Sequence, residues 1–224
     1  MGDNITMNGN GVVWGTVLAI ALGMGFPALS SAEEPSADDF YRFGVVLQQE
    51  GLVEEAIAQY REALRLNPQL AQVYVNLGVA LMERGDREGA IAAYQQALQV
   101  DPQLGEAYFN WGNVLIRQNQ LDGAIEKYQR AVEIQPNYDK AYYNLANALA
   151  LLEDFEGAIA AWNQAIRINP EFAQAYANLG VVLHQQEQIP QAVASLERAY
   201  VLFQQQGNVG QAQRIEGYLQ QLRS

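Results

Sequence analysis

The sequence contains no cysteine and a single histidine, His184. Without cysteine the chain has no disulfides, thiolate nucleophiles, thiolate-bound metals or lipid-modified cysteine. One histidine makes neither a metal site nor a catalytic triad. Acidic pairs such as Asp38-Asp39 and Glu54-Glu55 stand where helices should begin, and negative charge there suits the helix dipole. No glycine-rich phosphate loop is present. We therefore expect no enzyme activity, no metal site and no cofactor.

Basic residues are also few, with 13 Lys and Arg against 25 Asp and Glu and a formal net charge of −12. A surface that acidic repels phosphate backbones, so we expect no nucleic-acid partner. Half of the residues are hydrophobic and only 7 are proline, which is typical of a folded chain with a buried core.

The N-terminal segment has a different character from the rest of the chain. Residues 11–28 form an apolar run without charge, followed by small residues up to Ala32. This favours a signal peptide cleaved after Ala32. The absence of Lys and Arg before the run is atypical, so an uncleaved membrane anchor and a buried helix remain alternatives. Accordingly, we expect an exported bacterial protein, located in the periplasm or an internal lumen, or anchored to a membrane through residues 11–28.

Four prolines reveal an internal repeat, because each follows the previous one by 34 residues: Pro68, Pro102, Pro136 and Pro170. Such a period indicates a repeat array. With residues 1–32 assigned to the signal peptide or anchor and 33–36 to a linker, the remaining chain divides into five repeats at 37–70, 71–104, 105–138, 139–172 and 173–206. Residues 207–224 read as one more amphipathic helix that caps the array.

Other columns of the repeat align with the prolines. Position 4 is aromatic, position 8 is small and positions 20 and 27 are alanine throughout. Position 24 holds Tyr60, Tyr94, Tyr128, Trp162 and Leu196. This pattern resembles the tetratricopeptide-repeat family over 170 of the 224 residues. The resemblance implies an all-α, right-handed superhelical solenoid of antiparallel helix pairs, in which the first helix of each repeat lines a concave, protein-binding groove.

Positions 2, 6, 9 and 13 lie opposite the core side of the first helix and would therefore face that groove. Position 6 carries an asparagine row, which position 9 widens in repeats three and four: Asn76, Asn110, Asn144 and Asn178, with Asn113 and Asn147. A side-chain amide donates and accepts hydrogen bonds, so the row could hold the backbone of an extended peptide. The row resembles the asparagine ladder of O-GlcNAc transferases.

Position 5 lies on the flank of the same face and holds Tyr41, Val75, Phe109 and Tyr143. We expect these side chains either to form apolar pockets for a partner or to pack against the adjacent repeat. The groove basic residues are Arg42, Arg117 and Lys140, spread over three repeats, which departs from the carboxylate clamp of chaperone-binding repeats. Arg117 and Lys140 could still hold one acidic group near Asn113 and Asn147.

Two functions follow from these patterns. The first is an interaction scaffold or assembly factor that binds an extended segment of another protein in the groove. The alternative is a membrane-anchored structural organiser of a larger complex, which acts through the edges of the array or by self-association.

Overall fold

The computed structural model describes residues 35–223, and the chain forms two compact units, Met1–Ser36 and Ala37–Ser224. The predicted signal peptide or anchor lies outside the described residues. Within residues 35–223, no helix is both long enough and apolar enough to cross a membrane.

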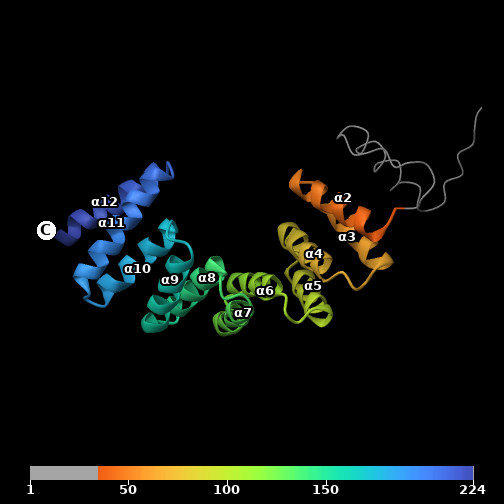
Figure 1. The fold of residues 1–224 in the computed structure, drawn as a ribbon, viewed down its shortest axis with the longest axis horizontal. Coiled ribbons are helices and arrows are strands. Elements are labelled where there is room, and N and C mark those ends of the chain that lie inside the picture. Colours follow the sequence, from red (N-terminus) through yellow and green to blue (C-terminus); the bar gives the residue numbers. More distant parts are fainter. Residues whose placement is uncertain (1–34, 224) are drawn as a thin grey trace, which may run out of the picture. The chain divides into compact units, whose positions relative to one another are not determined.

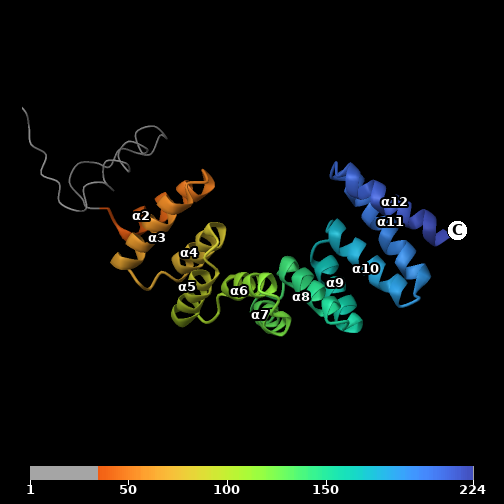
Figure 2. The ribbon, with the colours of Figure 1, turned by 180° about the vertical axis from the view of Figure 1, so that it is seen from behind.

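The second unit consists of helices joined by short turns, and residues 35–223 contain no strand. Figures 1 and 2 show the helices following one another in chain order. The first helices of the pairs are α2 (Ala37–Gln49), α4 (Ala71–Arg84), α6 (Gly105–Arg117), α8 (Asp139–Leu151) and α10 (Ala173–Gln185). Their partners are α3 (Val53–Leu66), α5 (Arg87–Val100), α7 (Leu121–Ile134), α9 (Phe155–Ile168) and α11 (Ile189–Gln205), followed by α12 (Val209–Arg223). The predicted all-α class is confirmed.

Local sequence explains where the helices end. The turn after each first helix contains a residue with positive φ, and glycine provides it after α2 and α4, at Gly51 (77°) and Gly85 (93°). Later turns use Asn119, Glu153 and Glu187 instead. The second helices α3, α5 and α9 end at a residue in extended conformation directly before a proline, where the proline ring disfavours helix.

The core of each of the first four helix pairs contains an aromatic ring packed against a small residue, and Leu196 replaces the ring in the fifth pair. The aromatic side chains at position 24 are almost fully buried, including Tyr60, Tyr128 and Trp162. A Cβ added at Gly112 would lie 2.6 Å from Cε1 of Tyr128, so a larger residue at this point would hold the two helices apart. The small residues therefore set the close approach of α6 and α7.

The C-terminal helix α12 packs on α11. Its apolar side chains Ala212, Ile215 and Leu219 are buried against a cluster that includes Leu196 and Phe203 of α11. Most polar residues of α12 are exposed, namely Gln213, Arg214, Glu216, Gln220 and Gln221, which gives the last repeat a solvated outer face.

Candidate functional site

The asparagines of position 6 lie half-buried on successive first helices, α4, α6, α8 and α10. The amides of Asn110, Asn113, Asn144, Asn147 and Asn178 are called the amide strip below. The sequence predicts that they hold the backbone of an extended peptide. The structure shows that they differ, because several already bind one another.

Two amides of the strip each accept two hydrogen bonds. Asn113 Oδ1 accepts from Tyr128 Oη and from Asn144 Nδ2, both at 2.8 Å. Asn147 Oδ1 accepts in the same way from Trp162 Nε1 at 3.1 Å and from Asn178 Nδ2 at 2.9 Å. In each case a buried ring of one repeat and an asparagine of the next repeat share one amide oxygen. This arrangement ties neighbouring repeats together along the strip.

The tryptophan determines which way the amides point. An indole N–H only donates, so Trp162 requires the oxygen of Asn147 on its side. Asn113 has the same orientation, with its oxygen toward Tyr128. The Nδ2 groups of Asn147 and Asn113 make no hydrogen bond within the described residues. The same holds for the Oδ1 atoms of Asn144 and Asn178. The strip therefore alternates unused donors with unused acceptors.

The hydrogen bonds of the position 6 asparagines differ in the N-terminal repeats. Asn76 Nδ2 donates to Tyr41 Oη at 3.3 Å, and Asn76 Oδ1 accepts from Gln72 Nε2 at 3.2 Å. Asn110 makes no hydrogen bond within the described part of the chain, since Val79 occupies position 9 of the preceding repeat. The four asparagines of position 6 therefore differ in the hydrogen bonds that they make, and their role in peptide binding stays a prediction.

The rings at position 5 contact neighbouring rings and stay half-buried. The centroid of the Phe109 ring lies 4.8 Å from that of Tyr138, and Tyr143 lies 4.7 Å from Phe172. Val75 is fully buried, so an apolar pocket there is excluded.

Tyr41 lies 6.2 Å from the ring of Tyr60 in the adjacent helix. Burial raises the pKa of both phenols, and that of Tyr60 reaches about 12. These ring contacts lie within single repeats, whereas hydrogen bonds from Asn76 to Tyr41 Oη and from Asn178 to Tyr143 Oη join position 5 to the adjacent repeat.

The three basic residues do not act as a group. Arg42 is exposed and pairs with Asp38 of the same helix at 2.7 Å. Lys140 is exposed and does not line the hollow beside the amide strip. Only Arg117 lines it, and the pairing of Arg117 and Lys140 around one acidic group stays a prediction.

A hollow of about 270 Å³ lies against the strip between α6 and α8. Its lining combines amides, a guanidinium group and apolar side chains: Asn113, Ile116, Arg117, Tyr128, Asn144, Asn147, Ala148 and Leu151. Sequence reasoning missed Ile116 and Leu151. Leu151 is 64% exposed and stands at position 13, which already faces the predicted groove. An apolar residue at a solvent-facing position was the signal that could have identified it.

Two family profiles match the sequence. The profile described as "TPR repeat" matches residues 44–83, 78–118, 112–153 and 146–187, and that described as "Tetratricopeptide repeat" matches 172–212. The comparison with curated protein sequences gave no match.

Several solved structures are similar to the chain. A crystal structure of MamA is 25% identical, with a TM-score of 0.67, and the match covers 74% of this chain and 96% of that one. YrrB, described as a TPR protein with an unusual peptide-binding site, is 24% identical with a TM-score of 0.64, covering 81% and 92%. MamA 41-end from Desulfovibrio magneticus RS-1 is 23% identical with a TM-score of 0.68, covering 78% and 99%. The chain belongs to the tetratricopeptide-repeat family.

Proposed function

We propose that the protein is an interaction scaffold that binds an extended segment of another protein along the amide strip. Membership in the repeat family supports a role in protein–protein interaction, and the similar YrrB is described as having a peptide-binding site. The observation that carries the proposal is the fixed polarity of the strip. Asn113 and Asn147 present unused donors, while Asn144 and Asn178 present unused acceptors.

This alternation suits a peptide backbone, which offers one N–H and one C=O per residue. The donors of the strip would bind peptide carbonyls, and its acceptors would bind peptide N–H groups. Because hydrogen bonds within the repeats already orient these amides, less side-chain freedom is lost when a peptide binds.

The hollow beside the strip would select the side chains of the bound segment. Arg117 is exposed and has no ion-pair partner within residues 35–223. It would attract a carboxylate, which a guanidinium group binds through two parallel hydrogen bonds. Leu151 and Ile116 would cover an apolar side chain. We expect the partner segment to carry an acidic residue close to an apolar one.

The test is affinity capture from soluble and membrane extracts with the full chain as bait, beside the variant Arg117→Ala/Leu151→Ala. Truncating two side chains at the centre of a contact should weaken binding at least about tenfold, which corresponds to about 1.4 kcal/mol. A partner retained by the unmodified chain and lost by this variant supports the proposal.

The control is Arg167→Ala/Leu152→Ala, which makes the same chemical changes away from the hollow. Arg167 is exposed on α9, and Leu152 is 45% exposed but does not line the hollow. All three proteins should melt alike, since the four side chains contribute little to the core. Equal capture by all three would mean that Arg117 and Leu151 do not contact the partner, and would rule out the hollow as part of the binding site.

A further inference from the structure

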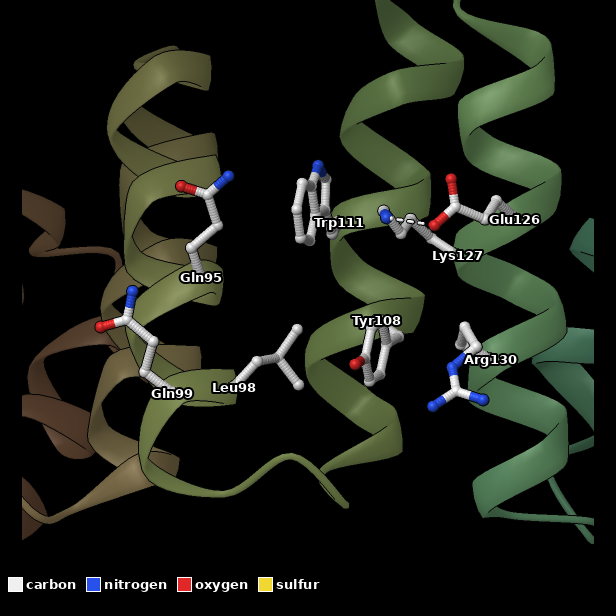
Figure 3. A pocket seen from close by; sticks show the side chains of 8 residues that line it. All are labelled: Gln95, Leu98, Gln99, Tyr108, Trp111, Glu126, Lys127 and Arg130. Carbon is white, nitrogen blue, oxygen red and sulfur yellow. Dashed lines mark hydrogen bonds and ion pairs between the residues drawn. The ribbon is translucent and has the colours of Figure 1, made fainter.

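A second hollow, of about 360 Å³, lies between α5, α6 and α7 (Figure 3). Its lining residues are Gln95, Leu98, Gln99, Tyr108, Trp111, Glu126, Lys127 and Arg130. Counting roughly 100° per residue, the mean direction of Tyr108 and Trp111 around α6 lies about 160° from the mean direction of Asn110 and Asn113. The hollow is therefore on the opposite side of α6 from the amide strip.

The residues of this hollow depart from what the fold requires. Position 7 is a buried leucine in three other repeats, with Leu77, Leu145 and Leu179 between 5% and 8% exposed. Repeat three has Trp111 instead, and this larger ring is only half-buried. Lys127 likewise stands at position 23, where Ala93 and Ala161 are buried. Since leucine and alanine satisfy the helix packing elsewhere, packing alone does not explain Trp111 and Lys127.

Both cations of the hollow rest on aromatic rings. Lys127 Nζ lies 4.4 Å from the centroid of Trp111, and the guanidinium carbon of Arg130 lies 6.0 Å from that of Tyr108. Figure 3 shows Lys127 reaching from α7 toward the Trp111 ring. The side chain of Lys127 is only 16% exposed. These contacts hold the two positive charges at fixed places beside an apolar surface.

The present acidic partners of these cations are exchangeable. Lys127 pairs with Glu126 at 2.7 Å and Arg130 pairs with Glu133 at 2.6 Å, and both carboxylates are mostly exposed. Ion pairs with exposed carboxylates contribute little to stability. A carboxylate from another molecule, buried against Lys127 and Arg130, would be less screened by solvent than Glu126 and Glu133. It would therefore take the place of these two glutamates.

We propose that this hollow is a second docking site, which binds an acidic segment of another protein through a carboxylate and an adjacent apolar side chain. The carboxylate binds Lys127 and Arg130. The apolar side chain covers Leu98 and the exposed part of Trp111, and the amides of Gln95 and Gln99 bind the backbone. Charge favours this occupant: the lining has two cations and one carboxylate, whereas the whole chain carries a net charge of −12.

The experiment uses the indole N–H signals of the ¹⁵N-labelled full chain in nuclear magnetic resonance spectra. The probe is a degenerate peptide mixture in which Asp or Glu alternates with Leu, Ile or Phe, and the reference mixture has Lys in place of the acidic residues. We expect the acidic mixture to shift the Trp111 signal. The signal of Trp162, which is 2% exposed, is the internal reference and should stay in place.

Two variants place the effect at this hollow. Lys127→Ala introduces the residue found at the same position in repeats two and four. It should weaken the binding of the acidic mixture at least tenfold. Arg117→Ala/Leu151→Ala should leave the Trp111 shift unchanged, which separates this site from the amide strip. The proposal is overturned if the acidic mixture leaves the Trp111 signal in place, if the basic mixture shifts it equally, or if Lys127→Ala has no effect.

Discussion

Single residues decide what the amide strip can bind. Tyr128 and Tyr94 occupy position 24 of adjacent repeats and both are about 1% exposed. Tyr128 Oη donates to Asn113 Oδ1 at 2.8 Å, whereas Tyr94 makes no hydrogen bond within the described residues. The difference arises at position 9, which is Asn113 in one repeat and Val79 in the other. The sequence shows the asparagines in register, but not which atoms of them are already engaged.

The two tyrosines provide a matched prediction. Tyr128→Phe removes a donor from an amide oxygen and should lower the free energy of unfolding by about 1 kcal/mol. Tyr94→Phe removes a hydroxyl without a protein partner and should change it by much less. Urea unfolding followed by circular dichroism measures both. Equal losses in the two variants would mean that the hydrogen bond to Asn113 does not tie the repeats together.

At the scale of helices, small residues determine how closely the two helices of a pair approach. Gly112 of α6 lies against the Tyr128 ring of α7, whereas Gly217 of α12 has no atom within 4 Å of an added Cβ. Both glycines are in helices, so the backbone preference for alanine is the same. The surrounding space alone distinguishes them.

The same substitution should therefore have opposite effects at these glycines. Gly112→Ala overpacks the pair and should cost about 1–3 kcal/mol. Gly217→Ala should stabilise the chain by about 0.5–1 kcal/mol, because alanine is the better helix former. Thermal unfolding of the two variants beside the unmodified chain checks both signs. A stabilising effect of Gly112→Ala would show that α6 and α7 do not need this close contact.

At the scale of the whole molecule, buried tyrosines make the stability of the array depend on pH. Burial raises the pKa of Tyr60 and Tyr138 to about 12, and raises that of Tyr94 and Tyr128 further. The ordinary value is 10.0. Between pH 10 and 12 the unfolded chain would have released these protons while the folded chain retains them. Stability from these groups is therefore complete below pH 10 and declines as the pH rises through 12.

We accordingly expect alkaline unfolding within that window, measured by helical circular dichroism and tyrosinate absorbance on the same samples. The ionisation of the buried tyrosines should accompany the loss of helix, because each ring must leave the core to ionise. If their tyrosinate signal appeared while the helices persisted, the position 24 rings would be accessible in the folded array. Neutral-pH controls at matched salt separate this effect from screening of the acidic surface.

The sequence by itself determined the family, the all-α class and the helix pairs, because a period of 34 residues repeats the same packing requirements at the same positions. Prolines, glycines and small residues act locally, so their effects can be read along the chain. The assignment of residues 1–32 as a signal peptide or anchor stays a prediction. Only the tertiary structure decided which side chains are free. Val75 is buried and the position 5 rings contact neighbouring rings, two amide oxygens are shared between repeats, and Leu151 is exposed and Trp111 half-buried in hollows. Each of these outcomes depends on neighbours contributed by another helix or repeat, which the spacing along one helix does not specify.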